Sequence, residues 1–323
     1  MKTVHKFNKL LYFFSGFLIG AFIVINIIGM IAGNTLYVML NNKQQVDDLV
    51  PALANHSQNV DRIREMEAAK KWERAEVTTQ DGYQLVGTYI KNPVNTDKAI
   101  IILHGLYQNR AMSMDYVPLY QKLGFNILLV DLRGHGQSGG QMTWGKKETG
   151  DIDKWMDYLK NIKNNNKIGI HGVSLGGSYA LLHSGSNAPI KADFYVEDSA
   201  YDDLAHIYRE KLREFFQLPR DNLVIGVLWR YCQLSMYWHT KETMADLSPI
   251  RAVVKAQAPI LFLHSGADTL IPEKSLQKLY KATPSYKEYY VFPNAAHAVS
   301  ISNNPEEYFA VVHKFLKNIN LSN

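Results

Sequence analysis

The chain has 323 residues, with 35 lysines and arginines against 30 aspartates and glutamates, and a formal net charge of +5. Hydrophobic residues make up 46% of it and charged residues 20%, a composition that excludes intrinsic disorder and requires a packed globular core. The single cysteine, Cys232, excludes an internal disulfide, a Cys-x-x-Cys redox site and a zinc site built on cysteines.

The positive charge is concentrated at the N-terminus. Lys2, Lys6 and Lys9 precede a long apolar segment, and without them the net charge falls from +5 to +2. No cluster of lysine and arginine remains that would predict a nucleic-acid partner. Three lysines before the apolar segment, against Lys43 soon after it, favour a cytoplasmic N-terminus over residues 1–9.

Residues 10–33 carry no charge, and Ser15 and Asn26 are their clearly polar members. As a helix this segment would span about 36 Å, enough to cross a hydrocarbon core roughly 30 Å thick. A buried core helix would be shorter and keep a polar stripe, and a cleavable signal peptide would have a shorter apolar region. We therefore predict a signal anchor in the lipid of the cell membrane, with the following domain outside the cytoplasm.

Residues 34–72 are polar and charged, and an apolar spacing within them predicts a helical stalk or linker. From Glu73 the pattern changes to short apolar runs. Residues 75–79 and 85–90 are predicted strands, and Asp81-Gly82 between them is a hairpin signal.

Short apolar runs then alternate with segments of helical pattern, which predicts a mostly parallel sheet with helices on both faces. Further strands are predicted over residues 99–103, 126–130, 168–170, 192–196, 260–263 and 289–292, and helices over residues 114–123, 151–161, 178–184, 274–281 and 305–316. Helical segments over about residues 201–251 interrupt this alternation and predict a cap inserted into one α/β domain, residues 73–320.

Gly172-Val173-Ser174-Leu175-Gly176 matches the pattern G-x-S-x-G. It follows the predicted strand 168–170 and precedes a helical segment. A sharp strand-to-helix turn exposes its central serine and needs small residues two positions to either side, which Gly172 and Gly176 supply. We predict Ser174 as a nucleophile.

A serine hydroxyl needs a base, and the base needs an orienting carboxylate. His297 lies in a short loop after the last predicted strand, and Asp268 lies just past the strand 260–263. The order Ser174, Asp268, His297 is that of a triad on this kind of sheet. Asp198, which follows the preceding strand, is the rival acid.

An oxyanion formed at the serine needs two backbone N–H donors. Leu175, directly after Ser174, is the first predicted donor. The second is predicted in the loop after the strand 99–103, where Gly105 permits a close turn, with Leu106 as the donor and Tyr107 as the alternative.

The segment 134–139 spells G-x-G-x-x-G after a strand, but a loop-like sequence follows it where a dinucleotide site would need a helix. No Walker loop and no H-E-x-x-H motif occurs. We therefore predict no cofactor and no metal.

Together, His104-Gly105, the segment 131–138, the G-x-S-x-G elbow, Asp268 and His297 resemble the α/β-hydrolase superfamily over about residues 73–316. More narrowly, the chain resembles membrane-anchored bacterial serine hydrolases with an esterase-like or serine-aminopeptidase-like domain. The resemblance implies an eight-stranded sheet whose second strand is antiparallel, with Ser174 as nucleophile, His297 as base and Asp268 as its orienting acid. It also implies that the segment 131–138 is a structural loop beside the site.

The expected activity is hydrolysis of small carboxylic esters, with an apolar acyl group held in part by aromatic and aliphatic residues of the cap. The alternatives are a peptidase or acyltransferase that uses the same three residues, or a non-catalytic surface binding protein.

Overall fold

The computed structural model describes residues 2–40, 61–219 and 222–322. Its contacts divide the chain into two compact units. One unit comprises residues 47–207 and 244–323, and the other comprises residues 1–46 and 208–243.

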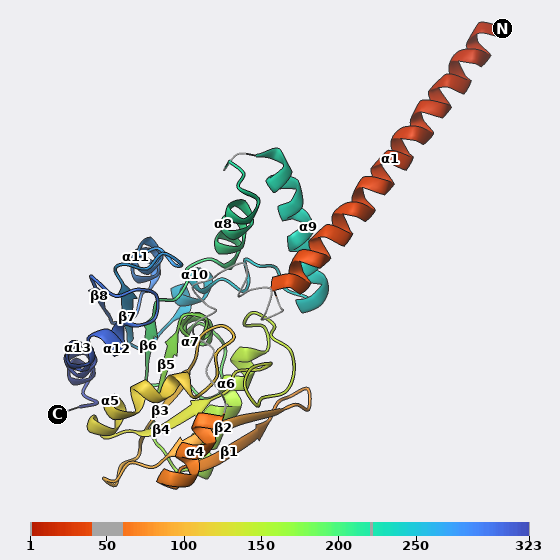
Figure 1. Ribbon diagram of the computed structural model, residues 1–323. Helices are drawn as coiled ribbons and strands as arrows, with labels where there is room; N and C mark the ends of the chain where they lie inside the picture. Colours follow the sequence, from red (N-terminus) through yellow and green to blue (C-terminus); the bar gives the residue numbers. More distant parts are fainter. Residues whose placement is uncertain (1, 41–60, 220–221, 323) are drawn as a thin grey trace. The chain divides into compact units, whose positions relative to one another are not determined.

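The larger unit is built on an eight-stranded sheet of order β1-β2-β4-β3-β5-β6-β7-β8 (Figure 1). Its strands are β1 (Glu73–Thr78), β2 (Gln84–Ile90), β3 (Lys98–Leu103), β4 (Asn126–Val130), β5 (Lys167–Val173), β6 (Phe194–Asp198), β7 (Ile260–Ser265) and β8 (Lys287–Phe292). Strand β2 is antiparallel to both β1 and β4, and the other neighbours pair in parallel. The predicted α/β-hydrolase sheet with an antiparallel second strand is confirmed.

Strands β5 and β6 extend beyond their predicted C-terminal ends. The predicted ends, Ile170 and Val196, are the last residues of the apolar runs, whereas the ladders continue to Val173 and Asp198. Polar residues in these extensions are fully buried, as His171 shows: its Nδ1 lies 2.8 Å from the Tyr120 hydroxyl. A hydrophobic pattern ends where polar residues begin, although such residues can continue a buried strand if their hydrogen bonds are satisfied.

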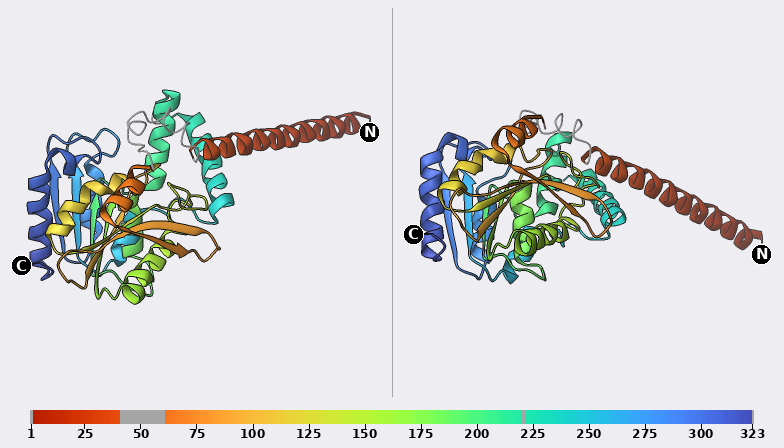
Figure 2. Two further views of the ribbon diagram at one scale, coloured as in Figure 1. Left: turned by 60° about the horizontal axis from the view of Figure 1, so that its bottom comes forward. Right: turned by 90° about the horizontal axis from the view of Figure 1, so that it is seen from below.

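Helices cover both faces of the sheet, as predicted. They are α4 (Asp61–Lys70), α5 (Val117–Lys122), α6 (Glu148–Asp157), α7 (Leu175–Ser184), α10 (Pro249–Ala252), α11 (Lys274–Ala282), α12 (Ser300–Asn303) and α13 (Pro305–Asn318). Single turns of 3₁₀ or π type occur at Met112–Tyr116, Tyr158–Ile162 and Val253–Lys255. Figure 2 shows α4 and α5 on one side of the sheet and α6 on the other.

Helix α4 lies within the segment predicted as a stalk, but its Ile63 is fully buried in the core, and Met66 and Trp72 pack against the same core. This part of the predicted linker is therefore integrated into the larger unit. Most of the helix is charged, so the sequence resembles a linker, yet a few apolar contacts suffice to hold a short helix on a domain. The rest of the predicted stalk, over residues 41–60, lies outside the described residues.

The other unit contains α1 (Lys2–Leu40), α9 (Leu223–Thr240) and the end of α8 (Leu204–Phe216). Helix α1 extends beyond the predicted apolar segment 10–33. Its segment Tyr12–Met39 is long and apolar enough to cross a membrane, a criterion that a signal sequence also meets. The side chains of Lys2, Lys6 and Lys9 lie outside the described residues. Helices α8 and α9 make up most of the predicted cap insertion.

Candidate active site

Ser174 occupies the sharp turn between β5 and α7, with φ 54° and ψ −115°. A Cβ on Gly172 would lie 2.1 Å from the carbonyl oxygen of Gly176, and a Cβ on Gly176 would lie 2.3 Å from that of Leu103. Both distances are too short for any side chain, so the turn requires glycine at both positions. A positive φ is strained for a serine. Strained backbone conformations of this kind occur at functional sites, where the surrounding structure holds them in place.

Loops after β8 and β7 bring His297 and Asp268 to this serine. His297 Nε2 lies 2.8 Å from Ser174 Oγ, and His297 Nδ1 lies 2.6 Å from Asp268 Oδ2. The backbone N–H groups of Leu270 and Ile271 both donate to the other carboxylate oxygen, at 2.8 and 2.9 Å. These bonds hold the carboxylate in one orientation, in which Nδ1–H donates to Asp268 and Nε2 can accept the serine proton.

The rival acid Asp198 is not hydrogen-bonded to His297. It is fully buried at the end of β6, where it accepts hydrogen bonds from the Ser199 hydroxyl at 2.8 Å and the Tyr308 hydroxyl at 3.0 Å. Burial raises the pKa of its carboxyl group. The structure therefore brings Asp268, and not Asp198, to the histidine.

The loop after β3 runs past the serine. A Cβ on Gly105 would lie 3.5 Å from Ser174 Cβ, and the Gly105 N–H donates to Gln108 Oε1 at 2.9 Å. Helix α7 begins at Leu175, and the first N–H groups of a helix have no acceptor within the helix. Both predicted donor segments thus border Ser174, and the donor roles of Leu106 and Leu175 stay predictions.

The segment 131–138 supports this loop from behind, as the resemblance implied. Its Leu132 N–H donates to His104 Nε2 at 3.0 Å, and His104 Nδ1 lies 2.7 Å from the carbonyl oxygen of Gly105. Burial lowers the pKa of both His104 and His135, which therefore stay neutral and fill structural positions at physiological pH.

Sequence reasoning missed the buried charges that hold the segment 131–138. Asp131 accepts hydrogen bonds from the backbone N–H groups of Arg110 and Gln137, at 2.7 and 2.8 Å, and is paired with the Arg110 guanidinium. That guanidinium also lies 3.2 Å from Glu67 on α4. No signal in the sequence marks these three charged residues as buried partners, since they lie on segments far apart in the chain.

A cavity of about 230 Å³ is lined by sequence neighbours of Ser174 and His297, although no triad residue itself lines it. Its wall includes residues next to the functional groups: Val173 before the serine, Ala298 after the histidine, and His104 and Gln108 of the loop after β3. The remaining lining residues are Met112, Ser113, Asp115, Tyr116, Val299, Ile301 and Ser302. All of them belong to the larger unit.

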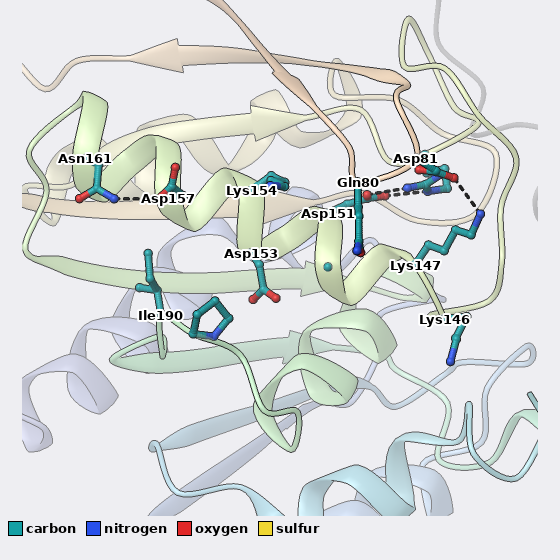
Figure 3. Close-up of a pocket in the computed structure, with 13 residues that line it drawn as sticks. Gln80, Asp81, Lys146, Lys147, Asp151, Asp153, Lys154, Asp157, Asn161 and Ile190 are labelled. Atoms are coloured by element: carbon teal, nitrogen blue, oxygen red, sulfur yellow. Dashed lines mark hydrogen bonds and ion pairs between the residues drawn. The ribbon is translucent and has the colours of Figure 1, made fainter.

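A larger hollow, of about 1010 Å³, lies along α6, and none of its lining residues belongs to the triad (Figure 3). Asp81 binds Arg133 at 2.9 Å and Lys147 at 2.7 Å, and Arg133 also binds Asp151 at 2.7 Å. The hydrogen bond from Arg133 holds the pKa of Asp81 well below its usual range. These charged side chains pair with one another, and they indicate no particular ligand for the hollow.

Among residues 2–40, 61–219 and 222–322, no group of three or more histidines, cysteines, aspartates or glutamates is arranged to hold a metal ion.

The family model described as the alpha/beta hydrolase fold matches residues 98–193, from β3 to the residue before β6. Protein YqkD of Bacillus subtilis (strain 168) is 35% identical over 241 residues, 74% of this chain and 77% of its own length. Protein YfhR of Escherichia coli (strain K12) is 24% identical over 242 residues, 72% and 75% of the two lengths. The Pyrococcus furiosus esterase Pf2001 superposes with a TM-score of 0.62 at 26% identity, over 76% of this chain and 91% of that one.

Proposed function

The chain belongs to the α/β-hydrolase family, and on that premise we propose that it is a serine esterase, which cleaves carboxylic esters through an acyl-enzyme. The observation that carries the proposal is the continuous series of hydrogen bonds from Asp268 through His297 to Ser174. It is supported by the elbow, whose positive φ turns the serine out of the strand.

In the proposed reaction His297 Nε2 takes the proton from Ser174 Oγ as that oxygen attacks the ester carbonyl. Asp268, which accepts from Nδ1, stabilises the imidazolium that forms. The N–H groups of Leu175 and Leu106 are proposed to bind the negative oxygen of the tetrahedral intermediate. His297 then protonates the leaving alcohol, and water activated by the same histidine releases the acid from Ser174.

We propose that the 230 Å³ cavity receives the acyl group. Its wall is mixed, with apolar side chains such as Met112, Val173 and Ile301 and polar ones such as Gln108, Asp115 and Ser302. We propose that the apolar part of the wall holds the acyl chain. The volume of the cavity is below the roughly 300–1,000 Å³ of pockets that hold drug-sized ligands, so a short chain fits best. That cap residues also line the acyl pocket stays a prediction.

Met112, which is half-buried in the wall of this cavity, offers a test of the assignment. We expect Met112→Trp to lower kcat/KM for p-nitrophenyl butyrate by about 10-fold or more relative to p-nitrophenyl acetate, because each methylene in an apolar pocket contributes about 1–3 kcal/mol to discrimination. Met112→Leu, of similar volume, is the matched control and should leave the ratio near that of the unsubstituted chain. An unchanged ratio in Met112→Trp would place the acyl group elsewhere.

Peptide hydrolysis is the second candidate, because one carboxylate lines the cavity. Asp115 is exposed at its wall, where it accepts a hydrogen bond from the Ser302 hydroxyl at 3.3 Å, and it could pair with the terminal ammonium of a peptide. For an esterase we expect Asp115→Asn to change ester turnover little, and the esters to be turned over faster than alanine p-nitroanilide. Faster turnover of the anilide, lost in Asp115→Asn, would favour a peptidase. Transfer of the acyl group to an added alcohol would identify an acyltransferase.

We also propose that α1 is the predicted signal anchor, with residues 1–9 in the cytoplasm and the larger unit outside the cell membrane. The apolar segment Tyr12–Met39 supports a membrane span. The proposed partners are therefore a small ester substrate and membrane lipid, with no nucleic acid.

A further inference from the structure

Helices α1 and α9 of the smaller unit cross in contact near the C-terminal end of α1 (Figure 1). The Tyr231 hydroxyl donates to Asn26 Oδ1 at 3.1 Å, and His239 Nε2 lies 2.8 Å from Asn34 Oδ1. The Tyr37 ring stacks on His239 at the same end, with centroids 4.2 Å apart and planes 5° apart.

Two glycines of α1 allow this close approach. A Cβ on Gly29 would lie 2.2 Å from the Tyr231 ring, and a Cβ on Gly33 would lie 2.5 Å from the Tyr231 backbone oxygen. Small residues four apart, together with polar side chains that bond across the interface, are how helices associate inside a bilayer. The contact therefore has the chemistry of a membrane helix pair.

A different face of α9 carries large side chains that remain exposed. They recur at intervals of three, four or seven residues, which places them on one stripe of the helix. Their exposed fractions lie between 42 and 82%, and they are Leu223, Val227, Leu234, Tyr237 and Trp238. Arg230, the only lysine, arginine, aspartate or glutamate in α9, is exposed on the same stripe, three residues after Val227 and four before Leu234. Large exposed apolar side chains gathered on one helix face mark a surface that contacts a partner or a membrane, and an arginine among them can extend its guanidinium to the lipid headgroups.

We infer that α9 is a second membrane-embedded element, whose exposed apolar face contacts the lipid of the bilayer that α1 crosses. Lipid is the occupant favoured because the face belongs to a helix that packs against a candidate membrane span. Trp238 and Tyr237 at its C-terminal end, with Lys241 Nζ 4.8 Å from the Trp238 ring centroid, match the side chains enriched at the membrane surface.

The contacts place α9 at the C-terminal end of the apolar segment of α1, because they run from Asn26 to Tyr37 and α1 ends at Leu40. Polar and charged residues, Arg220-Asp221-Asn222, directly precede Leu223 in the sequence. Leu223 and Leu234 are therefore both expected at the membrane surface. The inference depends on the proposed membrane anchor and is independent of the proposed esterase activity.

The test uses the full chain in phosphatidylcholine–phosphatidylglycerol nanodiscs, with its one cysteine removed as Cys232→Ala. A nitrobenzoxadiazole label is attached to Leu223→Cys or Leu234→Cys, and lipids with brominated acyl chains serve as the quencher. We expect each label to lose about half of its fluorescence, because the apolar face of an interfacial helix lies roughly 5–10 Å into the headgroup–acyl boundary. Bromines near the headgroups should quench both positions more strongly than bromines near the chain ends.

Two further labels make the outcomes distinct. Phe22→Cys, on the exposed apolar part of α1, reports whether α1 is inserted, and Val94→Cys, equally exposed on the larger unit, should not be quenched. Quenching at position 22 but not at 223 and 234 would overturn the inference and leave the anchor intact. No quenching at 22, 223 or 234 would overturn both. A label at 234 that is shielded from water but not quenched would mean that a second protein copy covers the face, which also overturns the inference.

Discussion

Replacement of Ser174 by alanine is expected to lower kcat for ester hydrolysis by about 10⁶-fold, because the acyl-enzyme can no longer form. His297 and Asp268 lose their function with it, since they act only through the serine oxygen, from which Nε2 is 2.8 Å away. The residual rate would reflect substrate binding and stabilisation of the oxyanion alone. Hydrolysis of p-nitrophenyl esters by the purified full chain in detergent measures the change.

Covalent labelling separates this result from a folding defect. A fluorophosphonate forms a bond to an activated serine oxygen and releases fluoride, so the unsubstituted chain should be labelled and Ser174→Ala should not. Ser186→Ala is the matched control and should retain both labelling and turnover, because its hydroxyl bonds only to the nearby backbone after helix α7, donating to the His183 carbonyl oxygen and accepting from the Ala188 N–H. Labelling that persists in Ser174→Ala would assign the nucleophile to another residue, and no labelling of the unsubstituted chain would favour a non-catalytic binding protein.

Replacement of Asp131 by alanine is expected to destabilise the larger unit by about 3–5 kcal/mol, because it leaves a buried charge without its main partner. The Arg110 side chain is fully buried, and its remaining partners would be Glu67 at 3.2 Å, Gln137 at 2.8 Å and the Thr88 hydroxyl at 2.9 Å. Two backbone N–H groups, of Arg110 and Gln137, would lose their acceptor as well. Urea unfolding of the full chain in detergent gives the change in the free energy of unfolding.

An exposed ion pair provides the comparison. Arg64 lies 3.4 Å from Asp61 on α4, with side chains 59% and 64% exposed, and Arg64→Ala should cost less than about 1 kcal/mol. The double variant Arg110→Met, Asp131→Ala should recover part of the loss, because the fully buried guanidinium is then absent. A change below about 1 kcal/mol in Asp131→Ala would contradict the assigned role of this buried pair.

The α/β-hydrolase sheet could be predicted because most of its strands contain a short apolar run, and the helices between them have helical periodicity. Ser174 could be predicted as well, since the elbow is local: Gly172, Gly176 and the serine lie within five residues, and the collisions that demand glycine arise within or beside that turn. The polar ends of β5 and β6 could not, because hydrogen bonds to distant residues such as Tyr120 and Tyr308 make their burial possible.

The sequence by itself determined the class of fold, the proposed nucleophile, the order of the three proposed catalytic residues and the long apolar segment near the N-terminus. Only the tertiary structure decided that Asp268 rather than Asp198 meets His297, since Asp198 is held at the buried end of β6 whereas Asp268 lies in the loop after β7. It likewise decided the burial of Arg110 against Asp131 and the pairing of α1 with α9. Patterns along a chain report each element's own periodicity, whereas contacts between residues as far apart as Asn26 and Tyr231 depend on how whole elements pack.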